Sequence, residues 1–123
     1  MKFDVCHHEN SKWMESLRFY AGEVKYFKKL LEEVKEKNTN EDLHKKIVDF
    51  EHQFTYTGEV IDNLTIGIQI QEQLFADYAQ DKRFLFDEQM ELIHERQRSA
   101  FEILEKDFTL HKSHLYHFLG EVL

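Results

Sequence analysis

Residues 13–34, WMESLRFYAGEVKYFKKLLEEV, decide the fold, because their apolar side chains recur at alternating spacings of four and three residues. The stripe runs through Trp13, Leu17, Tyr20, Val24, Phe27, Leu31 and Val34. This spacing is typical of an α-helix that buries one face. Because the pattern extends back past Cys6 and forward to Asn38, we predict a first helix over about residues 4–37.

Two further stripes with the same spacing follow along the chain. The second stripe runs from Leu43 to Tyr78 and the third from Met90 to Val122. They predict helices over about residues 40–79 and 86–121. Thr39, with Asp42 three residues later, has the spacing of a capping box and predicts the start of the second helix. Residues 55–58 have low helix propensity, but the stripe resumes in phase beyond them, so we expect one continuous helix.

The junction between the second and third helices has two interpretations. Residues 80–83 are polar and residues 84–86 break the apolar stripe, which favours a change of direction. The chain is then all-α: a single domain over residues 1–123 with three long antiparallel helices in an elongated up-down-up bundle with coiled-coil-like packing. In the alternative, the two helices fuse into one rod that needs a second chain to cover it.

Composition excludes several classes of protein. The chain has 123 residues, no proline and four glycines, which favours long helices and few turns. Its formal charge of −8 argues against binding to nucleic acid or to anionic membranes, since both require clustered Lys and Arg. No run approaches the roughly 18 apolar residues of a membrane helix. Cys6 is the only cysteine, so no internal disulfide forms and we expect a reducing, cytoplasmic environment.

Polar residues interrupt the stripes at one level of the predicted bundle. Three antiparallel helices place a residue of the first helix level with a residue about 85 positions later on the third. This rule brings together five polar side chains at one end of the core: His7, Asn10, Gln71, His94 and Gln97. They predict either a hydrogen-bonded cluster that fixes helix register, or a metal or small-ligand site. In the second case His7 and His94 are the candidate ligands of a divalent transition metal.

One pattern also resembles a known group of proteins. It consists of Trp13-x-x-x-Leu17-x-Phe19-Tyr20-x-x-Glu23-Val24, followed by Asp62 and by the helix that contains His94. In this pattern the chain resembles small, uncharacterised all-helical bacterial proteins. The resemblance implies a helical fold over most of the chain and supplies no activity.

These observations predict an interaction or scaffold protein rather than an enzyme. The sequence has no glycine-rich phosphate loop, no Gly-x-Ser-x-Gly elbow and no Cys-x-x-Cys pair, so we expect no catalytic residues and no cofactor. A protein partner or self-association is the expected use of such a bundle. Phe19 and Tyr26 lie off the first stripe and either form a partner surface or widen the core. The alternative function is metal or small-ligand binding by His7, Gln71 and His94.

Overall fold

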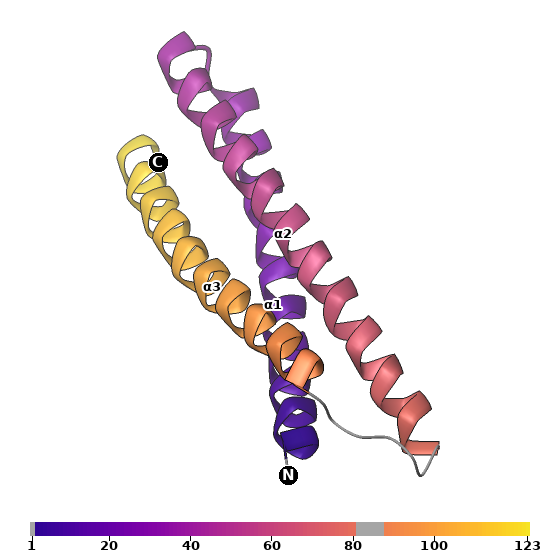
Figure 1. Ribbon diagram of the computed structural model, residues 1–123. Helices are drawn as coiled ribbons and strands as arrows, with labels where there is room; N and C mark the ends of the chain where they lie inside the picture. Colours follow the sequence, from indigo (N-terminus) through magenta and orange to yellow (C-terminus); the bar gives the residue numbers. More distant parts are fainter. Residues whose placement is uncertain (1, 81–87) are drawn as a thin grey trace.

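The computed structural model describes residues 2–80 and 88–123, which form three helices. They are α1 (Lys2–Lys37), α2 (Glu41–Gln80) and α3 (Glu88–Val122), and they run up, down and up again (Figure 1). Apart from residues 38–40 and Leu123, every described residue is helical. The predicted all-α bundle of three antiparallel helices is confirmed. The fused rod is wrong, because α3 packs back along α2.

The predicted helix boundaries differ little from those of the structure. The first helix begins two residues earlier than predicted, and the second and third end one residue later. Helix α2 continues through residues 55–58, as the phase of its stripe indicated, and the Thr57 hydroxyl donates to the carbonyl of Gln53 at 2.9 Å. The predicted third-helix start at residue 86 and the predicted turn at 80–86 fall almost entirely on residues 81–87, outside the described ones.

The capping residue of α2 differs from the prediction. Helix α2 begins at Glu41, and the side-chain oxygen of Asn40 accepts a hydrogen bond from the backbone N–H of Leu43 at 3.1 Å. The predicted cap at Thr39 is therefore wrong. Asparagine is as good a cap as threonine, so its position next to the first helical residue decides which of the two caps the helix. The connection from α1 to α2 is consequently a turn of only residues 38–40.

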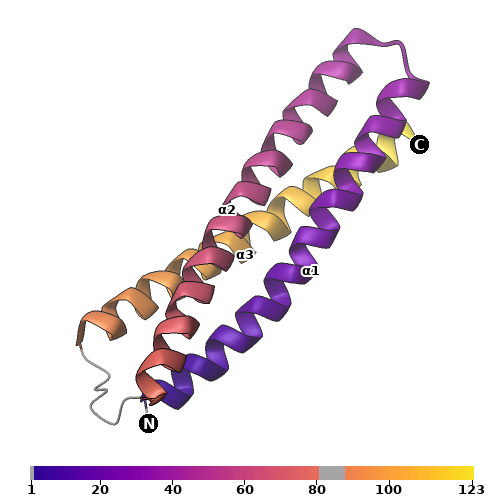
Figure 2. The same ribbon diagram turned by 90° about the vertical axis from the view of Figure 1, so that its right-hand side faces the viewer.

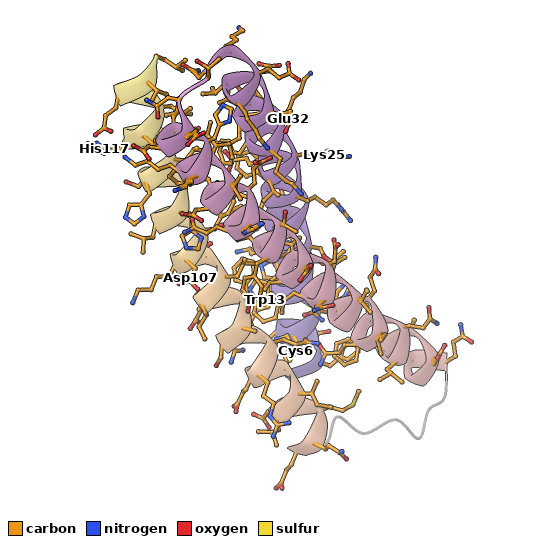
Figure 3. The ribbon with its side chains drawn as sticks, turned by 90° about the horizontal axis from the view of Figure 1, so that it is seen from above. Cys6, Trp13, Lys25, Glu32, Asp107 and His117 are labelled. Carbon is orange, nitrogen blue, oxygen red and sulfur yellow. The ribbon has the colours of Figure 1, made fainter. Side chains whose placement is uncertain are left out.

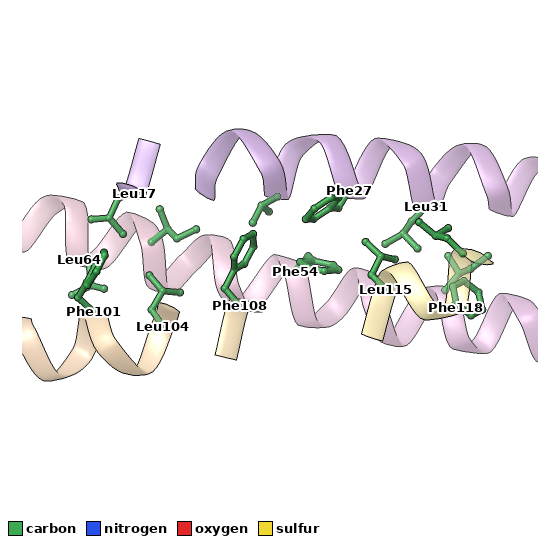
Figure 4. Close-up of a cluster of buried hydrophobic side chains, with 14 of the residues drawn as sticks. Leu17, Phe27, Leu31, Phe54, Leu64, Phe101, Leu104, Phe108, Leu115 and Phe118 are labelled. Carbon is green, nitrogen blue, oxygen red and sulfur yellow. The ribbon is translucent and has the colours of Figure 1, made fainter. Parts of the chain in front are cut away.

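The three stripes meet in one apolar core that follows the length of the bundle (Figure 4). Aromatic rings fill its middle: the Phe27 ring lies 5.4 Å from that of Phe54 and 6.3 Å from that of Phe108, between ring centroids. Tyr20 extends this group, with its ring 4.9 Å from Phe108. Ring pairs at these separations add to the stability gained from buried apolar area. The core therefore depends on aromatic residues from all three helices.

The outer surface of the bundle is polar over much of its length. Helix α3 is inclined across the pair formed by α1 and α2 (Figure 2). Cys6 and Trp13 are buried, whereas Lys25, Glu32 and His117 are exposed (Figure 3). None of the described helices is long and apolar enough to cross a lipid bilayer.

We expect Gly22→Ala to raise the free energy of unfolding by about 0.5–1 kcal/mol, because glycine in a helix interior loses more backbone entropy than alanine on folding. Gly22 lies within α1, is exposed, and a Cβ added there would meet no atom within 4 Å. Urea denaturation followed by circular dichroism measures the change. The neighbouring exposed Ala21→Gly is the reciprocal control and should lose a similar amount. A loss of stability in Gly22→Ala would contradict the expectation.

Candidate functional site

The first candidate site is the group of polar side chains near the start of α1. Asn10, Gln71 and His94 come from α1, α2 and α3, and all three are buried, with 1% of His94 exposed. Buried polar groups are costly unless they are hydrogen bonded. The arrangement of donors and acceptors therefore determines what this cluster can do.

Hydrogen bonds connect the three buried residues in a chain. Asn10 Nδ2 donates to Glu72 Oε2 at 3.1 Å and to Gln71 Oε1 at 2.9 Å. Gln71 Oε1 also accepts from His94 Nδ1 at 2.9 Å, and Glu9 Oε1 lies 3.1 Å from His94 Nε2. Carbonyl and carboxylate oxygens only accept hydrogen bonds, so both ring nitrogens of His94 are engaged by oxygen acceptors.

Glu9 is shared between His94 and Arg98. The guanidinium of Arg98 donates from Nε to Glu9 Oε2 at 3.0 Å and from Nη2 to Glu9 Oε1 at 2.5 Å. This two-point geometry is the strong form of the arginine–carboxylate pair. The hydrogen bond from Arg98 is the main cause that lowers the pKa of Glu9; burial opposes it, and the bond from His94 lowers the pKa further. Glu9 therefore joins Arg98 to His94 at the edge of the core.

The ring of Trp13 stacks on the ring of His94. The Trp13 ring lies 4.9 Å from the His94 ring at an interplanar angle of 25°, and the Phe101 ring lies 5.8 Å from that of Trp13. Trp13 therefore shields the His94 ring from water and joins the cluster to the apolar core.

The structure brings together some of the five predicted residues and leaves others apart. His7 is exposed, and its Nδ1 forms an ion pair with Glu72, through which it reaches Asn10. No hydrogen bond connects Gln97 to the cluster; its buried Oε1 has no partner in the described part of the chain. His7 and His94 thus bind different acceptors rather than a common point. Among residues 2–80 and 88–123, no group of three or more His, Cys, Asp or Glu side chains could hold a metal ion. Metal binding by His7 and His94 stays a prediction.

Sequence reasoning left Glu9, Glu72 and Arg98 out of the cluster, because none of them lies on an apolar stripe. Long side chains can reach a polar group from the flank of a helix. The offset of about 85 positions between level residues of the first and third helices did contain a usable signal. Glu9 and His94 are 85 positions apart and are hydrogen bonded at 3.1 Å. Tyr20 and Glu105 are also 85 positions apart and are hydrogen bonded at 2.9 Å. A search for polar residues of the first and third helices at that offset could therefore have predicted both contacts. For Tyr20, burial and the carboxylate of Glu105 raise the pKa to about 12.

Cys6 lies close to this cluster and is buried. Burial, followed by the negative charge of Glu9, raises the pKa of its thiol. A thiolate is the reactive form of cysteine, so this environment makes Cys6 less nucleophilic than a free thiol. The cluster is therefore a hydrogen-bonded network that joins three helices, in which the buried Oδ1 of Asn10 has no partner among the described residues.

The second candidate site is an apolar surface between α2 and α3, which we call the α2–α3 face. Its positions recur at spacings of three and four on each helix and flank the core stripe, so that Val60 and Ala100 also pack against the core. On α2 they are Tyr56, Val60, Asn63, Gly67, Ile70 and Leu74, and on α3 they are Ile93, Arg96, Ala100, Ile103, Asp107 and Leu110. Six of the thirteen exposed large hydrophobic residues in the described ranges belong to this face, with exposed fractions of 40–67%.

The α2–α3 face is hollowed near its middle. A cavity of about 210 Å³ opens between the two helices and is lined by Tyr56, Thr57, Val60, Ala100, Ile103, Leu104, Asp107 and His111. Nδ1 of His111 is buried there without a hydrogen-bond partner in the described residues. Small-molecule sites occupy about 300–1,000 Å³, whereas a cavity of about 150 Å³ already accommodates a benzene ring. The cavity therefore suits one large apolar side chain.

Two other surface features are less suited to binding an apolar partner. Phe19 and Tyr26 on α1 are 62% and 59% exposed, so the alternative that they widen the core is wrong. They lie on the outer side of one helix, where the Phe19 ring is 6.2 Å from that of Tyr20 and the Tyr26 ring is 5.9 Å from that of Phe27. A depression of about 380 Å³ near the α1–α2 turn carries charges of both signs, from Asp42, Lys46 and Glu121.

Comparison with known proteins provides no relative for either site. No family model, no curated protein and no solved structure matches the chain. The geometry of the two candidate sites is therefore the basis for any functional proposal.

Proposed function

We propose that this chain is a non-enzymatic interaction protein and that the α2–α3 face is its binding surface. The observation that carries the proposal is the concentration of exposed apolar side chains on this face around a cavity of side-chain size. Contiguous apolar patches on a soluble protein mark interaction sites, because water contact with them is unfavourable. Two rows of apolar side chains with a hollow between them suit a helical partner.

The polar cluster supports this assignment by its chemistry. His94 uses both ring nitrogens, and Glu9 is held by Arg98 and His94 together, so these groups are already occupied by one another. Such a network fixes the relative position of the three helices and keeps the α2–α3 face rigid. In this proposal the protein acts in the cytoplasm, where Cys6 stays reduced.

Site-specific photo-crosslinking in the cells that produce the protein tests the proposal. We expect a photoreactive residue at Ile103 to yield a discrete crosslinked protein adduct, because a bound partner would cover this exposed side chain. The same residue at Tyr26, which is equally exposed on α1, is the matched control and should yield no such adduct. A second substitution, Tyr56→Glu, should remove the Ile103 adduct. Equal adducts from Ile103 and Tyr26, or none from Ile103, would refute the proposal.

A further inference from the structure

We propose that the α2–α3 face binds the same face of a second copy of this chain, with the helices antiparallel about a two-fold axis. This inference rests on the proposed function, because it takes that face as the binding surface and names its occupant. In a two-fold interface, residues at equal distances on either side of the axis meet each other. A face suited to such pairing must therefore be complementary to its own reversed copy.

The pattern on α2 has this property about a centre between Asn63 and Gly67. An axis at that point brings Asn63 opposite Gly67 of the second copy. The amide side chain of Asn63 therefore faces a glycine, which leaves room for it. The outer positions pair apolar with apolar: Tyr56 with Leu74 and Val60 with Ile70. Each of these contacts occurs twice in the dimer.

The pattern on α3 has a matching centre between Ala100 and Ile103. These two residues face each other across the axis, which places the small side chain of one copy against the large one of the other. Ala100 also lines the cavity of about 210 Å³, so Ile103 of the second copy is positioned to enter it. Ile93 and Leu110 form the outer apolar pair.

One axis can serve both helices because the two centres lie within about one helical turn of each other in height. A Cβ added at Gly67 would lie 3.5 Å from Nε2 of Gln97, which fixes the level of α2 against α3. The cavity lining, which joins Tyr56 and Val60 to Ile103 and Asp107, gives the same alignment. The stripe from Tyr56 to Leu74 is about 27 Å long at 1.5 Å per residue, which provides an extended contact.

The charges on the face complete the complementarity. Arg96 and Asp107 are its only charged residues, and neither makes a hydrogen bond or ion pair with any other residue that the structure describes. They lie at equal distances on either side of the α3 centre, so Arg96 of each copy meets Asp107 of the other. Opposite charges at fixed positions specify orientation and register. In a parallel two-fold arrangement α3 would instead lie on α2 of the second copy, whose positions on this face carry no charge to pair with Arg96 or Asp107.

The oligomeric state in solution gives the first test. Sedimentation velocity at about 150 mM salt, where long-range repulsion between two chains of charge −8 is screened, should find the purified chain as a concentration-dependent dimer. Ile103→Glu should weaken dimerisation more than tenfold, because the carboxylate would enter the apolar cavity. Tyr26→Glu on α1 is the matched control and should leave the dissociation constant unchanged. Circular dichroism should show both variants helical.

Charge reversal tests the antiparallel register itself. Arg96→Asp alone and Asp107→Arg alone should each weaken dimerisation by about tenfold, since each places like charges opposite one another twice. Mixing these two variants should restore dimerisation, as a heterodimer, because every pair then has opposite charges. A purely structural effect of either substitution would not be rescued by mixing.

Each outcome decides between the two proposals. A dimer lost in Ile103→Glu and rescued by mixing the charge variants supports the inference. A monomeric chain, or a dimer insensitive to these substitutions, overturns it. If the Ile103 photoadduct then contains a different protein, the proposed function stands while the second copy is rejected. If no adduct forms either, both proposals fail.

Discussion

Phe54→Ala is expected to lower the free energy of unfolding by about 3–5 kcal/mol, because a buried ring is replaced by a methyl group and the surroundings cannot collapse into the space. Phe54 is fully buried, and its ring contacts those of Phe27 and Phe108 from the other two helices. A domain is commonly stable by only about 5–15 kcal/mol, so the loss is a large part of the total. Urea denaturation followed by circular dichroism measures it.

Phe19→Ala is the matched control for this prediction. It removes the same ring from α1, but Phe19 is exposed and lies on the outer side of the helix. Its expected cost is below about 0.5 kcal/mol, the usual range for exposed positions. A Phe54→Ala cost no larger than that of Phe19→Ala would show that the aromatic centre does not hold the three helices together.

Glu9→Gln is expected to lower the free energy of unfolding by about 2–3 kcal/mol at pH 7, since hydrogen bonds to a charged group contribute more than neutral ones and Arg98 loses its counter-charge. The substitution keeps the size of the side chain. It removes the carboxylate that accepts from Arg98 and from His94. Glu15→Gln, an exposed position six residues along α1, is the control and should change stability little.

The pH dependence of the same variant provides an independent check. The pKa of Glu9 is lower in the folded protein than its ordinary value of 4.5. Its stabilising effect is therefore fully present above pH 4.5 and is lost as the pH falls through the folded pKa. The stability difference between wild type and Glu9→Gln should thus be constant from pH 7 to about pH 5 and shrink below pH 4.5. A difference that grows with acidification would refute the role assigned to Glu9.

The sequence predicts the three helices well because each buries one continuous stripe. Trp13, Phe27 and Leu31 repeat with the period of a helix, and few glycines and no prolines interrupt it. The cap at Asn40 was missed because several good capping residues stand next to one another, and tertiary packing decides where the helix begins. The remaining boundaries were close because apolar stripes end where the polar turns start.

The candidate sites were less predictable. Asn10, Gln71 and His94 could be named since a polar residue on an apolar stripe is conspicuous. Glu9 and Arg98 were missed because their long side chains reach the cluster from outside the stripe. Which residues form the α2–α3 face depends on the side of the α1–α2 pair against which α3 packs. Apolar periodicity alone does not determine that side, so Tyr56 and Ile103 could not be assigned to a common surface.

The up-down-up order of the helices also determines where attached groups would lie. Because α1 begins at Lys2 and α3 ends at Val122, and both run in the same direction, these two residues lie at opposite ends of the bundle (Figure 1). A helix of 35 residues spans about 52 Å. Labels at the two positions would therefore be held apart by the length of the bundle. In an antiparallel pair, each end of the assembly would present the start of α1 from one copy and the end of α3 from the other.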